Sequence, residues 1–238
     1  MPTEKLFFSI IIPAHNEEKY IVDTLNHIKA LDYPADRYET IIVENGSSDK
    51  TLDIINKYEG GNTFVLVSNR KGVSIAKNVG IEKRSKKCNW IVFLDADTLL
   101  KKNFLGSLNI FLIKNNYKNL TIGTTEIKPI PKRLVAQAWF IFYDIGHRLT
   151  KASYSIQILR NSVAEKFRFD ENMTMGEDFE LKQFARKQGK FFFFATKDVH
   201  TSTRRFDKEG WWKIFFSWTF VAALPTSMKK KFVYKVVR

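Results

Sequence analysis

Four apolar segments, each followed by a polar loop and a helical pattern, constrain the fold of this chain more than any other feature. They cover residues 7–12, 38–43, 64–67 and 91–94. Apolar runs this short are typical of strands buried in a parallel sheet, and strands that alternate with helices indicate right-handed crossover connections. We therefore expect an α/β protein with a mostly parallel central sheet flanked by helices.

The loops that follow these strands carry most of the polar side chains that could form a site. They contain His15, Asn16, Glu17, Glu44, Asn45, Lys71, Asp95 and Asp97. A single polar loop would mean little, because loops usually face solvent. In a parallel sheet, however, the carboxyl ends of the strands share one edge, where α/β proteins bind their ligands. We expect these side chains to converge there.

Asp95 and Asp97 are two residues apart, directly after the fourth apolar run. Alternate residues that leave a strand can point into one cavity. Two carboxylates so placed suit a sugar hydroxyl or a hard divalent cation, which takes oxygen ligands and bridges phosphates. The alternative is that they only cap a helix that begins near Leu99, since Asp is a favourable N-cap residue.

The composition bounds the size and the partners of the protein. The chain has 238 residues, of which 44% are hydrophobic, and no linker or repeat interrupts it, so we expect one continuous unit with a real core. The amino terminus does not read as a signal peptide, and no apolar run reaches the roughly 18 residues of a membrane span. A net charge of +14 favours anionic partners such as nucleotide phosphates or an acidic membrane surface.

Several classes of site find no support in the sequence. There is no glycine-rich dinucleotide fingerprint after the first strand and no P-loop motif. The single cysteine, Cys88, rules out an intramolecular disulfide framework and a multi-cysteine zinc site. Nucleic acid is not an expected partner, because charge alone would support it and no recognition motif is present.

The second half of the chain departs from strict strand-helix alternation. We expect strands at residues 121–127 and 155–159, an aromatic helix at 133–149, and a strand at 191–195 that is buried on both faces. Glu177 and Asp178 open a further helix, where acids also simply complement the helix dipole.

Three residues that follow the last of these strands in the sequence could complete a site. An imidazole such as that of His200 can join an oxygen-rich metal site, although a lone histidine is more often structural. Arg204 and Arg205 suit a diphosphate.

Five segments in order along the chain resemble the family 2 glycosyltransferases, whose catalytic domain has the GT-A nucleotide-sugar-binding fold. They are residues 9–17 (SIIIPAHNE), 42–51 (IVENGSSDKT), 72–80 (GVSIAKNVG), 93–97 (FLDAD) and 176–178 (GED). The resemblance implies transfer of a sugar from a nucleotide diphosphate sugar to an acceptor hydroxyl. It also implies a metal cofactor, Mn²⁺ or Mg²⁺, and inversion at the anomeric carbon.

The resemblance also implies roles for individual residues. Asp178 would be the general base, with the adjacent Glu177 as the alternative, and Asp97 would bind the metal, with His200 as a further ligand. The remaining implied contacts with the nucleotide sugar are Pro13, Ala14, His15, Glu17, Glu44, Asn45, Lys71, Gly72, Asn78, Asp95, Ala96, Arg204 and Arg205. Among them, the loop from Ala14 to Glu17 and the region of Glu44 would hold the nucleoside, and Asp95 would face the ribose or the diphosphate.

The chain departs from the family pattern at three places. The second loop reads Glu44-Asn45 where Asp-Asp is common, which leaves the base specificity open, with UDP favoured over GDP on family precedent. Lys77 stands where Arg is frequent, a tolerable change if the residue faces phosphate, since both side chains are cations. The motif around His200 is loose.

The carboxyl terminus suggests where such an enzyme would work. Residues 211–225 are rich in Trp and Phe with one charge, and the basic residues Lys229, Lys230, Lys231, Lys235 and Arg238 follow them. Such a segment suits the interface of an anionic membrane. The alternative is a helix that packs on the catalytic domain, and both can hold at once.

These observations lead to one expected organisation. Residues 1–205 would form the catalytic domain, with a nucleotide-sugar half at 1–98 and an acceptor half at 99–205, and residues 206–238 would form the membrane-associating segment. We expect a cytoplasmic protein that works peripherally on the cytoplasmic face of a membrane, with a lipid or lipid-linked saccharide as acceptor. The sequence carries no indication of the oligomeric state.

Two other functions stay open at this point. A degenerate family member would only bind nucleotide sugar or membrane. Asp-X-Asp after an apolar strand also resembles the haloacid dehalogenase-type phosphohydrolases, although that motif normally lies near the amino terminus.

Overall fold

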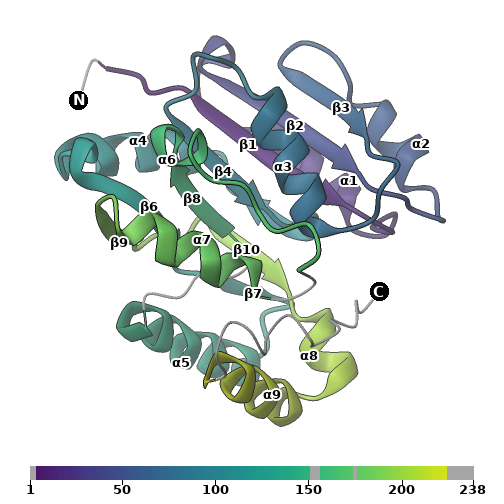
Figure 1. Ribbon diagram of the computed structural model, residues 1–238. Coiled ribbons are helices and arrows are strands. Elements are labelled where there is room, and N and C mark those ends of the chain that lie inside the picture. The colour runs from purple at the N-terminus through teal and green to yellow at the C-terminus, as the bar shows by residue number, and fades with distance from the viewer. Residues whose placement is uncertain (1–3, 151–155, 174–175, 224–238) are drawn as a thin grey trace.

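The computed structural model describes residues 4–150, 156–173 and 176–223. A seven-stranded sheet forms the centre of the molecule, with helices on both of its faces, and a smaller three-stranded sheet lies beside it (Figure 1). The predicted α/β class, with a mostly parallel sheet flanked by helices, is therefore confirmed.

The strand order of the large sheet is β3-β2-β1-β4-β8-β6-β9. Neighbouring strands run parallel except around β8, which is antiparallel to both β4 and β6. The strands are β1 (Phe8–Ala14), β2 (Tyr38–Glu44), β3 (Thr63–Val67), β4 (Trp90–Leu94), β6 (Leu120–Thr125), β8 (Ile156–Arg160) and β9 (Lys190–Phe194). Because β4 pairs with β8, the predicted halves 1–98 and 99–205 share one continuous sheet, and the boundary between them stays a prediction.

Alternation along the central strands builds a core on each face of the sheet. In β1, Ile10 and Ile12 pack with the helices α1, α2 and α4, whereas Ile11 packs on the opposite face with α3, α6 and α7. The helices of the first face are α1 (Ile21–Lys29), α2 (Thr51–Asn56) and α4 (Phe104–Lys114). Those of the second face are α3 (Val73–Lys83), α6 (Asn161–Ala164) and α7 (Glu177–Arg186). Two 3₁₀ turns, η1 (Ala35–Arg37) and η2 (Tyr117–Asn119), lead into β2 and β6.

The small sheet has the order β5-β10-β7, from β5 (Thr98–Leu100), β10 (Val199–Ser202) and β7 (Lys128–Ile130). The alternative that Asp95 and Asp97 cap a helix near Leu99 is therefore wrong, because that segment is a strand and the next helix begins at Phe104. Three further helices lie together below the sheets in Figure 1: α5 (Leu134–Thr150), α8 (Arg204–Glu209) and α9 (Trp211–Ala223).

The prediction that residues 191–195 form a strand buried on both faces is also wrong. This strand, β9, lies at the edge of the large sheet. Phe192 and Phe194 enter the core, whereas Phe191 and Phe193 on the other face are only half-buried. Its run of four phenylalanines hides an alternation that only the position of the strand in the sheet shows.

Within the described residues, the helices are all too short or too polar to cross a membrane. The longest apolar candidate, α5, has 17 residues.

Close packing of α3 on β1 depends on a glycine. A Cβ at Gly80 would lie far inside van der Waals contact of Ile11, a fully buried residue of β1. Such overlap in a packed core forces neighbouring side chains or the backbone to shift. Gly106 in α4 is also helical, but a Cβ there would meet nothing closer than a backbone oxygen at 3.9 Å.

The two glycines give a matched prediction. Gly80→Ala should lower the free energy of unfolding by about 1–3 kcal/mol, because the overpacking exceeds the gain in helix propensity. Gly106→Ala should raise it by about 0.5–1 kcal/mol, because only the propensity changes. Urea unfolding of both variants measures the difference, and equal effects would mean that α3 does not lie this close to β1.

Candidate active site

The carboxyl ends of β1, β2 and β4 meet at one edge of the large sheet. Ala14 at the end of β1 pairs with Glu44 at the end of β2. The register of β1 and β4 aligns Ile11 with Phe93, so the loop that begins at Asp95 starts beside the end of β1. The predicted convergence of the polar loops on this edge is present.

Hydrogen bonds tie the loops after β1 and β2 to one another. Asn16, whose φ of 54° places it in the left-handed region, donates its backbone N–H to Ser47 Oγ at 2.9 Å. Its side-chain oxygen accepts a bond from Ser48 N at 2.6 Å. Glu17 N donates to Thr51 Oγ1 at 2.7 Å, so the first turn of α2 also holds the first loop. The two loops that the family resemblance links to the nucleoside are thus joined by hydrogen bonds into one surface.

Three predicted nucleotide-binding residues lie on or against the second loop. The Glu44 carboxylate accepts a bond from Ser47 N, which closes the turn at Gly46. Asn45 is buried and donates its backbone N–H to Ala14 O at 3.1 Å. The aliphatic stem of Lys71 lies over Gly46, where a Cβ would be 3.0 Å from Lys71 Cε. Pro13 and Ala14 end β1, and His15 follows them directly.

Arg204, the first residue of α8, joins two of the predicted site loops. Its guanidinium makes a bidentate pair with Glu17, with both N–O distances at 2.6 Å, and its Nε lies 3.0 Å from Asp97 Oδ2. The group also lies over the ring of Tyr20, 4.4 Å from its centroid. Burial opposes its charge, but the hydrogen bonds that it donates to Glu17 and the charge of Asp97 raise the pKa of Arg204 above its usual value.

Lys77 on α3 holds the two acids that open α7. Its ammonium lies 2.7 Å from Asp178 Oδ1 and 3.2 Å from Glu177 Oε1, and the rings of Phe93 and Phe169 flank it at 5.8 and 5.1 Å. Burial opposes this charge, but the attraction of Asp178 and then Glu177 raises the pKa of Lys77 above its usual value.

Lys77 faces two carboxylates in this structure. It faces the predicted general base, because α3 and α7 pack on the same side of the sheet. Its place beside Asn78 in the motif at residues 72–80 was the only signal in the sequence that it belonged to the site.

Carboxylates outnumber cations in this cluster. Glu17, Asp95, Asp97, Glu177 and Asp178 face Lys77 and Arg204, so five acids minus two bases leave three negative charges when all are ionised. Desolvation by the surrounding protein and repulsion from Asp97 raise the pKa of Asp95 well above its usual value.

The neighbours of Asp95 respond to the same crowding. Desolvation raises the pKa of Asp97, against the attraction of Arg204. Burial, and then repulsion by Asp178, raises the pKa of Glu177 to about 7. Such perturbed carboxyls cluster at functional sites.

The donor set fits a divalent cation that is only partly held by protein. Within the described residues, no three His, Cys, Asp or Glu side chains are grouped closely enough to coordinate a metal. Mg²⁺ and similar ions at phosphate sites use one or two carboxylates, with substrate phosphates and water as the other ligands. Asp97 and Asp95, in a cluster with excess negative charge, match that pattern.

Some predicted site residues are engaged elsewhere. His200 lies on β10 with Nε2 3.2 Å from Lys197 O, and burial lowers the pKa of its imidazole. The side chain of Asn78 binds the backbone of Phe169 through both its ends, at 2.9 and 3.0 Å, which ties α3 to the segment before α7.

Arg205 turns away from Arg204 and pairs with Glu209 at 3.2 Å. Gly72, with a φ of 146°, is the residue before α3. Ala96 is buried, and its carbonyl accepts a bond from Thr24 Oγ1 at 2.7 Å. The roles proposed for these residues and for His200 and Asn78 stay predictions, and their contacts here are structural.

Comparison with known proteins identifies the family. The model of glycosyl transferase family 2 matches residues 9–172, more than half of the chain. The poly(ribitol-phosphate) β-N-acetylglucosaminyltransferase TarS of Staphylococcus aureus is 29% identical over 136 residues, which cover 56% of this chain and 23% of TarS. A dolichyl N-acetyl-α-D-glucosaminyl phosphate glucuronosyltransferase of Methanococcus voltae is 25% identical over 218 residues, 82% of this chain and 66% of that protein.

Solved structures confirm the fold. A TarS structure in complex with UDP-GlcNAc has a TM-score of 0.70 at 22% identity and covers 84% of this chain and 59% of that chain. The mannosyltransferase PcManGT of Pyrobaculum calidifontis, in complex with GDP-Man and Mn²⁺, has a TM-score of 0.68 at 18% identity and covers 92% and 63%. The predicted GT-A fold is therefore present, although the chain spans less than two thirds of the length of these relatives. Because the family model matches residues 9–172, more than half of the chain, this chain belongs to glycosyl transferase family 2.

Proposed function

We propose that the protein transfers a sugar from a UDP-sugar to an acceptor hydroxyl, with a divalent metal and with inversion at the anomeric carbon. The observation that carries this proposal is the cluster of five carboxylates and two cations where β1, β2 and β4 end. Family membership and the UDP-GlcNAc complex of the similar TarS support the choice of donor. The same membership leaves the phosphohydrolase alternative without support.

The donor would occupy the surface formed by the first two loops. Ala14, His15, Glu44 and Asn45 surround the position for the nucleoside, and Lys71 supplies a cation beside it. Arg204, which pairs with Asp97 at 3.0 Å, would bind the diphosphate, because a guanidinium suits phosphate groups as well as carboxylates. A metal bound at Asp97, with Asp95 beside it, would stabilise the negative charge on the leaving diphosphate.

Asp178 would act as the general base. It takes the proton of the acceptor hydroxyl, while the acceptor oxygen bonds to the anomeric carbon and the carbon–oxygen bond to phosphate breaks, leaving its electron pair on the diphosphate. The Asp178 side chain is 28% exposed and Glu177 is 11% exposed, so Asp178 is the carboxylate that an acceptor can reach. Lys77 is then a positioning residue, since it holds Asp178 in place without contact to the reacting atoms.

The cytoplasm is the proposed location, with the enzyme at the cytoplasmic face of a membrane and a lipid or lipid-linked saccharide as acceptor. The catalytic halves at 1–98 and 99–205 and the segment at 206–238 are part of the same proposal. A non-catalytic binder of nucleotide sugar is the competing reading, and turnover assays separate the two.

Asp178→Asn should lower kcat about 10²- to 10⁴-fold with little change in donor affinity, because the variant removes one positioned base. The readout is UDP release from UDP-GlcNAc with Mn²⁺, together with donor binding by calorimetry. Asp53→Asn, an exposed carboxylate on α2, is the control. Normal turnover by the Asp178 variant, or a product that retains the configuration of the donor, would contradict the assignment.

Asp97→Asn should keep the fold, since Arg204 still binds Glu17, but lose the metal dependence of UDP binding. A thermal-shift series with UDP, with and without Mn²⁺ or Mg²⁺, measures this. In the parent protein, UDP at 100 times its dissociation constant should stabilise by about 2.7 kcal/mol. If the variant bound UDP with the same metal dependence as the parent, Asp97 would not be a ligand.

Lys77→Met should destabilise the protein by roughly 3–5 kcal/mol at pH 8, because it leaves the buried acids Glu177 and Asp178 without their cation. The loss should shrink as the pH falls below 7, because Glu177, whose pKa burial raises to about 7, then becomes neutral and no longer needs the cation. Urea unfolding at several pH values provides the measurement. Lys77→Arg keeps the charge and should lose far less, whereas a loss independent of pH would show that only packing was changed.

A further inference from the structure

Exposed apolar side chains gather on two helices. Among the described residues, the large hydrophobic side chains that face solvent lie on α5 and α9, apart from Val22, Phe64 and Val67. We call this set the α5–α9 platform; it consists of Leu134, Val135, Ile141, Phe142, Ile145, Trp212, Phe216 and Phe220. Contiguous apolar surface of this kind marks an interaction site.

Helix α5 is two-sided. Ala136, Phe140 and Asp144, spaced four residues apart, are buried against the body of the protein. Ile141 and Ile145 lie on the opposite stripe and are more than half exposed. In a surface helix of a protein that meets only water, that outer stripe would be polar.

Helix α9 repeats this arrangement. Ile214 is buried in the core, which confirms the interpretation that the helix packs on the catalytic domain. Trp212, Phe216 and Phe220 follow one another at four-residue spacing and are all more than half exposed. The expected role at a membrane interface stays a prediction, and the exposed side of the helix is the one that it would use.

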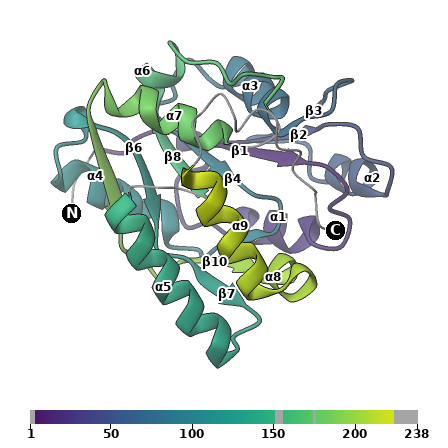
Figure 2. The same ribbon diagram turned by 60° about the horizontal axis from the view of Figure 1, so that its bottom comes forward.

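Aromatic contacts join the two helices into one surface. Trp139 of α5 meets Trp212 with ring centroids 4.9 Å apart, and Phe142 meets Phe215 at 5.7 Å. Figure 2 shows α5 and α9 side by side on the face turned toward the viewer. Their exposed stripes thus act as one platform.

The charges around the platform favour an anionic partner. The acids nearby are buried or paired: Asp144 is buried, Asp207 binds Arg133 at 3.0 Å, and Glu209 binds Arg205 at 3.2 Å. Lys132 and Lys213 are exposed at its borders. In the sequence, Lys229, Lys230 and Lys231 follow α9, outside the described residues.

We propose that the α5–α9 platform docks on the interface of an anionic phospholipid bilayer. Trp and Phe side chains favour the interfacial region of a bilayer, and each nearby cation adds to the attraction of anionic headgroups. The described parts of α5 and α9 carry exposed aromatic stripes and cations, and no exposed acid. Such a face fits an anionic bilayer better than it fits a second copy of a protein with a net charge of +14.

A short helix connects the platform with the reaction centre. Arg204, which binds Glu17 and Asp97, begins α8, and two residues later Phe206 stacks on Trp211 at 4.7 Å and meets Tyr143 at 5.9 Å. Docking would therefore place the carboxylate cluster beside the headgroups. From this geometry, and resting on the proposed function, we infer that the acceptor is a lipid-linked saccharide.

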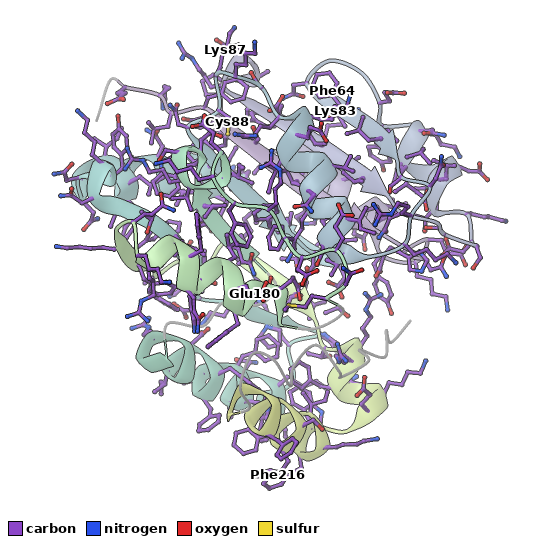
Figure 3. The ribbon with its side chains drawn as sticks, in the orientation of Figure 1. Phe64, Lys83, Lys87, Cys88, Glu180 and Phe216 are labelled. Atoms are coloured by element: carbon purple, nitrogen blue, oxygen red, sulfur yellow. The ribbon has the colours of Figure 1, made fainter. Side chains whose placement is uncertain are left out.

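Phe216 and Phe64 provide a matched test, because both are exposed phenylalanines, 64% and 46% accessible, at opposite ends of the molecule (Figure 3). The experiment is co-sedimentation of the full chain with phosphatidylcholine vesicles that contain or lack phosphatidylglycerol. The parent protein should bind only the anionic vesicles, and added salt should weaken the binding. Phe216→Ser should lower the partition coefficient about tenfold, whereas Phe64→Ser should leave it unchanged.

Ile145→Ser extends the test to α5, with Val22→Ser of α1 as its control. Equal vesicle binding by platform and control variants would overturn the proposal, as would binding indifferent to anionic lipid. Self-association in sedimentation velocity that both platform variants abolish, without vesicle binding, would identify a second copy as the occupant instead. UDP-GlcNAc hydrolysis in detergent-free buffer reports the catalytic proposal separately, and all four variants should retain it.

Discussion

The site depends on two cations, each of which holds two carboxylates at the edge of the sheet. Lys77 binds Glu177 and Asp178, and Arg204 binds Glu17 and Asp97. A buried ion pair contributes little to net stability, but the loss of one partner is costly because the other charge then stays buried without compensation. These two residues therefore fix the relative positions of the site loops and of the starts of α7 and α8 more than they stabilise the fold.

Each pair joins segments that are far apart in the sequence. Glu17 and Arg204 are separated by 187 positions and Lys77 and Asp178 by 101. Only the large sheet brings α3 and α7 to one face, and only the small sheet, in which β10 pairs with β5, brings the start of α8 beside the loop after β4. The architecture thus has a direct chemical role, since it supplies both cations.

The periodicity of the sequence predicts the sheet and its site edge well, because short apolar runs and polar loops are local signals. Asp95 and Asp97 follow β4 as expected. Local patterns could not predict β5, which is three residues long and stabilised by β10, or the exposed side of β9, which depends on its place at the sheet edge. They also could not predict that Lys77 faces Asp178, because the direction of a helical side chain depends on what packs against that helix.

The charge of the site opposes that of the whole protein, and this contrast bears on the cofactor. A chain with a net charge of +14 attracts a nucleotide diphosphate from a distance, yet its reaction centre holds more carboxylates than cations. A diphosphate placed beside Asp95 and Asp97 would be repelled by both carboxylates, just as burial and then the charge of Asp97 raise the pKa of Asp95. Arg204 alone cannot offset this repulsion, because it is shared with Glu17. On the proposed function, a divalent cation held by Asp97 would remove this conflict, and the excess of acids would then favour the metal–donor complex over the donor alone.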